Sequence, residues 1–194
     1  MRSMPKVVDV EERRLELTDA AARLIARAGI GAATMREVAA EAGLTTGALT
    51  HYFADKRELL LHTFQASLDS RRAQRPDREP IDARAALRSS LEGALPIDES
   101  RRRHWMVTVA FCAQAAGDDE LAAAQRDAYR EFRRHVETLV VEIGIADEAH
   151  AGHTAEQLIA QADGIAMQAL FDPDSWPGER QLAMLHTMLA PHGL

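Results

Sequence analysis

Cysteine and long apolar runs are scarce in this chain of 194 residues. Cys112 is the only cysteine, so an internal disulfide is excluded. It follows the apolar run 107–111, which indicates a buried, inert thiol; a reactive thiol is the alternative and would need exposure and a basic neighbourhood. No run reaches the roughly 18 apolar residues of a transmembrane helix, and residues 1–10 lack the apolar stretch of a signal peptide. We therefore expect a cytoplasmic protein with no membrane partner.

The sequence also lacks the motifs of common enzyme classes. We find no nucleophile elbow, phosphate-binding loop or zinc-protease helix motif. His150 and His153 have the spacing of a metal pair, with Glu148 nearby, but no third or fourth ligand has firm spacing. We therefore predict no enzyme, no metal and no cofactor. A hydrolase that uses Cys112 and a distant histidine is the competing hypothesis, and turnover in a substrate screen would favour it.

Positive charge is in short supply overall, because the net charge is −7. Residues 1–57 contain nine Lys and Arg against eight Asp and Glu, a balance of +1, and residues 58–194 contain fourteen against twenty-two, a balance of −8. A protein that coats nucleic acid without sequence preference relies on phosphate neutralisation, so this balance disfavours that class. Any DNA-binding surface should lie in the first third of the chain.

Strand-like alternation is missing too, and glycine and proline fall between amphipathic segments. The fold class predicted is all-α, with about nine helices. We divide it into an N-terminal domain of three helices, 1–57, and a C-terminal helical bundle, 58–194. The expected helices are 11–28, 34–42, 46–53, 56–75, 82–96, 98–116, 118–143, 154–171 and 179–190.

The informative stretch is 34–59, which contains two short helical segments joined by the turn Gly43-Leu44-Thr45. Thr34 and Glu37 form a capping box that opens the first segment, and Asp55 and Glu58 form another that opens the helix after the second. Helices of about eight residues are not stable alone, so both must pack against the preceding helix. Such a unit is typical of a helix-turn-helix, which holds its second helix outward for a DNA major groove.

From about Leu17 to Leu60 the sequence resembles the TetR family of bacterial transcriptional repressors. The resemblance rests on Ala42-Gly43-Leu44-Thr45, Gly47, His51-Tyr52-Phe53 and Lys56 at this spacing near the N-terminus. Residues 121–130 loosely resemble the choline-responsive BetI type. The resemblance implies a repressor that leaves its operator when a small-molecule effector binds. An activator is the alternative that remains open.

The motif residues divide into two expected roles, with Leu49 and Phe53 facing the core. We expect the recognition-helix side chains to face the groove and read bases, and a second group to hold phosphate. Gly47 would let the helix approach the DNA backbone closely. Thr50 stands where the family commonly has tyrosine and Thr46 where lysine is frequent, so fewer phosphate contacts are expected. The base-reading set is Thr46, Ala48, Thr50 and His51, and the phosphate set is Thr34, Thr45, Tyr52 and Lys56.

The second half is expected to hold the effector and to make a homodimer that reads a palindromic operator, as the resemblance implies. Polar residues among apolar ones, such as Gln161 and Asp163, would contact a ligand or one another across the dimer. The candidate ligand residues are Trp105, Val109, Phe111, Gln114, Tyr129, Phe132 and Met167. The candidate interface residues, on the last two long helices, are Ile165, Ala169, Leu170, Leu182, Leu185 and Leu189.

Overall fold

The computed structural model describes residues 10–73 and 82–194. Within these ranges the chain forms nine α-helices and two short 3₁₀ helices and no strand, which confirms the all-α prediction. In chain order they are α1 (Val10–Ala28), η1 (Ile30–Ala32), α2 (Met35–Glu41), α3 (Thr46–Leu49), α4 (Lys56–Ala73), α5 (Ala83–Glu92), α6 (Glu99–Ala115), α7 (Asp119–Glu142), α8 (Ala151–Phe171), α9 (Gly178–Leu189) and η2 (Ala190–His192). No helix of the described residues is long and apolar enough to cross a membrane.

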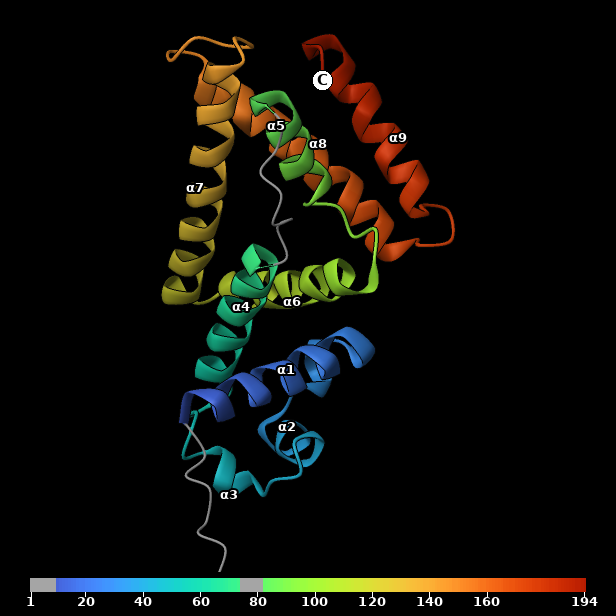
Figure 1. The fold of residues 1–194 in the computed structure, drawn as a ribbon. Coiled ribbons are helices and arrows are strands. Elements are labelled where there is room, and N and C mark those ends of the chain that lie inside the picture. Colours follow the sequence, from blue (N-terminus) through green and yellow to red (C-terminus); the bar gives the residue numbers. More distant parts are fainter. Residues whose placement is uncertain (1–9, 74–81) are drawn as a thin grey trace, which may run out of the picture.

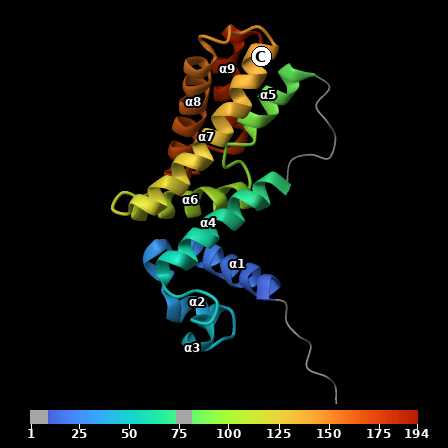
Figure 2. The same ribbon diagram turned by 90° about the vertical axis from the view of Figure 1, so that its left-hand side faces the viewer.

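The molecule is elongated, with α2 and α3 at one end and α5, α7, α8 and α9 toward the other (Figures 1 and 2). Helix α6 lies across the middle, next to α1 and α4 (Figure 1). Helix α4 therefore links the small N-terminal unit to the bundle above it.

Most helices begin after a residue whose side chain caps them, and Thr34 among these residues was predicted from the sequence. Thr34 and Thr45 accept hydrogen bonds from the backbone N–H groups of Glu37 and Ala48, each at 3.2 Å. Aspartates do the same for three later helices. Asp82, Asp98 and Asp118 accept from the amides of Ala85, Arg101 and Leu121 at 2.8, 2.9 and 3.1 Å. Each cap satisfies an amide that the helix itself leaves without a partner.

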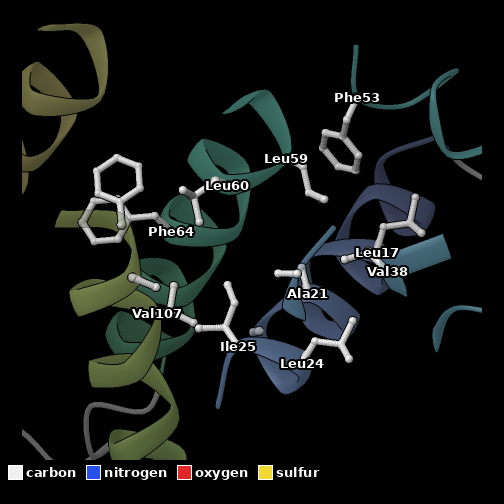
Figure 3. Close-up of a cluster of buried hydrophobic side chains, with 14 of the residues drawn as sticks. Leu17, Ala21, Leu24, Ile25, Val38, Phe53, Leu59, Leu60, Phe64 and Val107 are labelled. Atoms are coloured by element: carbon white, nitrogen blue, oxygen red, sulfur yellow. The ribbon is translucent and has the colours of Figure 1, made fainter. Parts of the chain in front are cut away.

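One hydrophobic core joins the N-terminal helices to α6 (Figure 3). Leu17 of α1, Val38 of α2 and Leu49 of α3 are completely buried in it. The same core continues through Phe64 of α4, whose ring stacks on that of Phe111 of α6 with 4.1 Å between centroids. Because these side chains form one packed body, α4 and α6 cannot shift without repacking part of the DNA-binding unit.

A second core holds the far end of the bundle together and draws on α5, α7, α8 and α9. Its completely buried members include Leu87, Val136 and Leu185. A small third group, in which Trp105 packs on Ala166 and Leu170, connects α6 to α8.

Three predicted boundaries were wrong. Helix α3 ends at Leu49, because the amides of His51 and Tyr52 bond three residues back, at 3.3 and 2.9 Å, in a tighter turn. Helix α5 ends at Glu92 rather than near Pro96. Helix α8 begins at Ala151, three residues early, because tertiary packing buries that side chain. The predicted loop 71–80 lies mostly outside the described residues.

Candidate nucleic-acid interface and effector cavity

Helices α2 and α3 meet at a turn that a glycine makes feasible. Gly43 has φ +68°, a left-handed conformation that residues with a side chain adopt at a cost. The amide of the next residue, Leu44, returns to the Ala39 carbonyl at 2.7 Å and closes the end of α2. This turn sets the direction in which α3 leaves the core.

Helix α3 lies at one end of the molecule, below α1 and α2 (Figure 2). Thr46, Gly47, Thr50 and His51 are exposed, as expected of residues that would meet DNA, whereas Ala48 is partly buried. Thr50 donates its hydroxyl proton to the Gly47 carbonyl at 2.8 Å, so its methyl group and lone pairs remain for a base. A Cβ at Gly47 would meet no atom of the chain within 4 Å, so packing inside the chain does not require a glycine there.

The expected core positions in and just after α3 are confirmed, since Leu49 and Phe53 are both 0% exposed. The phosphate candidates are less uniform. Thr45 is exposed, Thr34 and Lys56 are partly buried, and Tyr52 is partly buried against the core, so only part of its side chain can face DNA.

Arg14 of α1, which the sequence analysis missed, fixes the end of the recognition segment. It donates to the Tyr52 carbonyl at 3.0 Å, and its guanidinium lies 5.5 Å from the Phe53 ring centroid. It also lies 3.8 Å from a carboxylate oxygen of Glu58. No local pattern marks this residue, because its contacts lie about 40 residues away along the chain.

The bundle contains a cavity of about 640 Å³, bounded by α4, α5, α6, α7 and one residue of α8. This volume lies within the range typical of small-molecule sites. Its apolar wall includes Phe64, Leu68, Trp105 and Phe132. Arginine, histidine, serine and acidic side chains also line it, so the cavity is amphipathic.

His104 is the most deeply buried polar group of this cavity, at 7% exposure. Its Nδ1 lies 2.8 Å from the hydroxyl of Ser67 on α4, and Thr108 lies on its other side. Burial, helped by the charge of Arg71, lowers the pKa of His104 to about 3, so the imidazole is neutral at pH 7. His104 therefore lines the cavity and at the same time contacts α4, the helix that leads to the DNA-binding unit.

Each half of the chain matches a family model of bacterial transcriptional regulators. Residues 17–63 match the model of the bacterial regulatory proteins of the tetR family, and residues 83–192 match that of the C-terminal region of BetI-type transcriptional repressors. The chain belongs to the TetR family of transcriptional regulators. Within it, 32% identity over 174 residues links the chain to the HTH-type transcriptional regulator PksA of Bacillus subtilis, covering 88% of this chain and 84% of that one.

Two further matches cover almost the whole of this TetR-family regulator. The HTH-type transcriptional regulator BetI of Vibrio campbellii is 25% identical over 96% of this chain and 94% of its own. A transcriptional regulator of Rhodococcus sp. Rha1 has a similar structure, with a TM-score of 0.80 and 28% identity over 91% of this chain and 94% of that one. The relatives are transcriptional regulators rather than enzymes.

Of the seven ligand candidates in this TetR-family chain, three line the cavity: Trp105, Tyr129 and Phe132. The other four lie elsewhere. Phe111 is fully buried in the first core, and Val109 packs on the α6–α8 contact. Gln114 is exposed and Met167 is 38% exposed. Because residues 105–113 of α6 are apolar nearly all round, the sequence could not show which face of this segment borders the cavity.

The predicted dimer residues need a correction, because five of the six are buried within the single chain. Ile165, Ala169, Leu170, Leu185 and Leu189 are at most 3% exposed, and Leu182 packs partly against the second core. They hold α8 against neighbouring helices of the same chain, so they cannot offer much surface to a second copy. The apolar stripe that we assigned to an interface belongs to the core.

Two remaining sequence candidates do not join either site. In the described part of the chain, no three His, Cys, Asp or Glu side chains cluster as metal ligands, and His150 instead lies 2.6 Å from Asp147. Cys112 is partly buried. Its burial raises the pKa of the thiol, the nearby charge of Asp163 raises it further, and both disfavour the thiolate.

Proposed function

We propose that this regulator is a repressor that holds its operator as a homodimer and releases it when a small molecule fills the bundle cavity. The observation that carries the proposal is the position of α4. Its first turn, with Lys56, adjoins the recognition segment, and its later residues Phe64 and Leu68 line the cavity. A ligand that prefers one position of α4 therefore biases the DNA-binding unit, and a preference of about 1.4 kcal/mol corresponds to a tenfold change in affinity.

The second copy would dock on a face of α8 other than the predicted one. Six exposed residues of α8, spaced by three or four positions, include no Asp, Glu, Lys or Arg: His153, Gln157, Ala160, Gly164, Met167 and Phe171. Phe171 is 71% exposed, and a Cβ at Gly164 would meet nothing within 4 Å. The second half of this face is apolar and exposed, with the small residues Ala160 and Gly164 at its centre, which suits close packing of two helices. Gly164→Arg should therefore yield a monomer by mass measurement, whereas the control Glu142→Arg on α7 should remain a dimer.

Such a dimer would place its two recognition helices in successive major grooves of a palindrome, about 34–36 Å apart. It would act in the cytoplasm, where bacterial DNA is found. The division at residue 57 into a DNA-binding and an effector domain stays a prediction, and the core shared by α1, α4 and α6 supports close coupling between the two.

DNA selection from a random library tests the proposal directly. The purified chain should enrich one palindromic site, and salt titrations on that site should separate the two predicted roles. Lys56→Ala should weaken binding to all sequences alike and reduce the slope of log affinity against log salt by about one per subunit. His51→Ala should instead change the preferred base, because one good hydrogen-bonded pairing with a base discriminates by about 1–3 kcal/mol.

Selection without any enriched site would remove the DNA-binding proposal for this chain. If Lys56→Ala changed base preference and left the salt slope unaltered, the roles assigned to Lys56 and His51 would be wrong.

A further inference from the structure

The arginines of the cavity wall already have partners. Arg71 of α4 donates to the backbone carbonyl just after α5, at 3.1 Å, and takes part in a further interaction. Its neighbour Arg72 forms an ion pair with Glu131 of α7, and Arg101 of α6 lies 3.2 Å from a carboxylate oxygen of Asp98. All three arginines line the cavity, so an anionic ligand would have to replace one of these contacts.

The acidic side chains of the wall are compensated as well. Glu131 is paired with Arg72. Asp163 of α8 accepts a hydrogen bond from the Tyr129 hydroxyl at 2.8 Å. Burial raises the pKa of the Asp163 carboxyl group, and the positive charge of Arg71 acts in the opposite direction. This carboxyl group is therefore either inclined toward its neutral form or opposed by a nearby cation, and it attracts a cationic ligand weakly.

The polar groups that remain for a ligand are uncharged. His104 carries no charge at pH 7, because burial lowers its pKa to about 3. Gln125 of α7 also lines the cavity, and its amide oxygen is buried and accepts no hydrogen bond from any described residue. A buried acceptor without a donor is costly, and the soft last torsion of a glutamine side chain lets the amide turn toward a ligand. An O–H or N–H group in the cavity would supply the missing donor.

The rest of the wall is apolar and offers broad ring surfaces. Phe64 of α4, Trp105 of α6 and Phe132 of α7 line it. The Trp105 indole N–H donates to the Ala94 carbonyl at 2.6 Å, so this ring has no polar group left for a ligand. A cavity of about 640 Å³ with such a wall suits a molecule with a flat apolar body.

We infer that the effector is an uncharged molecule with a flat apolar body and a hydroxyl or N–H group that donates to the Gln125 amide. The body would lie against Phe64, Trp105 and Phe132. An ion of either sign would lose its water and gain no free counter-charge from the arginine, aspartate and glutamate side chains of this lining. The inference rests on the proposed function, since it names the ligand class of the same cavity.

The test compares probes that share the naphthalene ring system: 2-naphthalenemethanol, its methyl ether, 2-naphthoate and 2-naphthylmethyl-trimethylammonium. Binding of each to the full chain without DNA is measured by equilibrium dialysis. We expect the alcohol to bind about threefold more tightly than its more apolar ether, which has no donor, and about tenfold more tightly than either ion. Tightest binding of an ion, equal or tighter binding of the ether, or no binding of any probe would overturn the inference.

Variants then locate the acceptor. Gln125→Leu removes the amide, so the alcohol should lose its advantage over the ether. Gln114→Leu is the matched control, because Gln114 is exposed on α6 and does not line the cavity. An unchanged advantage in folded Gln125→Leu would overturn the role of Gln125. If Gln125→Leu fails to fold, the comparison of alcohol and ether on the unaltered chain decides whether the cavity requires a donor.

A second variant tests why ions are rejected. Gln125→Glu places a carboxylate without a counter-charge in the lining, so the ammonium probe should gain affinity severalfold while 2-naphthoate should lose it. Unchanged affinity of the ammonium probe in this variant would overturn the explanation that compensated charges exclude ions.

A DNA-release assay with the same probes separates this inference from the proposed function. An ion that binds the cavity most tightly and releases DNA would overturn the inference and leave ligand-controlled repression standing. An alcohol that binds with the expected preference supports the inference even when DNA remains bound, and that result would count against ligand-controlled repression by this class of molecule.

Discussion

The helix-turn-helix unit and the effector cavity differ in how completely side chains fill the space between helices. Around α3, Leu17, Val38, Leu49 and Phe53 are all completely buried in one apolar core. The bundle by contrast keeps about 640 Å³ open among α4 to α8, whereas one water molecule in the liquid takes up about 30 Å³. A DNA reader needs fixed helix positions, whereas an effector site needs a void and polar groups that packing alone would eliminate.

The largest expected effect on stability comes from opening a hole in the tightly packed N-terminal core. Phe53→Ala removes a fully buried ring, so we expect the free energy of unfolding to fall by about 3–5 kcal/mol in urea denaturation. His51→Ala, two residues earlier and exposed, is the control and should leave stability almost unchanged. A decrease below about 1 kcal/mol for Phe53→Ala would show that the N-terminal core is not tightly packed.

Enlarging one side chain in each region tests the difference in packing between the N-terminal core and the cavity. Ala39 is 1% exposed in the N-terminal core, and Ala128 lines the cavity. Ala39→Leu should lower the free energy of unfolding by about 1–3 kcal/mol, because no space exists for the added carbons. Ala128→Leu should change it by less than about 1 kcal/mol and should weaken binding of cavity ligands. Equal costs at the two positions would contradict the difference in packing.

The buried histidine gives the cavity region its own pH dependence. In the unfolded chain His104 takes up a proton near pH 6.5, and in the folded chain only near pH 3, so the unfolded state binds more protons between these values. Stability should fall as pH is lowered from 6.5 toward 3, by about 1.4 kcal/mol at pH 5.5 from this residue alone. Urea denaturation at pH 7.5 and 5.5 should show a smaller drop for His104→Gln than for the unaltered chain. Identical drops would mean that His104 is not held neutral.

The smallest effect is expected at the surface contact between the two regions. Arg57 at the start of α4 forms ion pairs with Asp118 and Glu120 at the start of α7, and these groups are solvent-exposed or partly so. Water and salt screen such pairs. Arg57→Met should shift the urea midpoint slightly at low salt and not measurably at about 0.5 M salt, with Arg88→Met as the exposed control. A large, salt-independent shift would show that this contact is a structural link between α4 and α7.

The sequence predicted those features of the structure that depend on neighbouring residues along the chain. The capping residues Thr34 and Asp55 act within four residues of themselves, and the structure confirms both. The helix-turn-helix depends on a short pattern as well, so its core residues Leu49 and Phe53 and the exposure of Thr46, Gly47, Thr50 and His51 could be derived from spacing.

Tertiary structure decided what local patterns leave undetermined. Much of α6 and α8 is apolar on several faces, so periodicity could not show that Phe111 fills the core or that Trp105 borders the cavity. Nor could it show that Ile165 and Ala169 pack inside one chain. Arg14 and Arg71 act through contacts with Tyr52 and Gly93, far away in sequence. The sequence by itself therefore determined the helices, their caps and the DNA-reading motif, because each depends on neighbours along the chain. Only the packing of distant helices decided where the cavity lies, which charges line it and which faces remain for a partner.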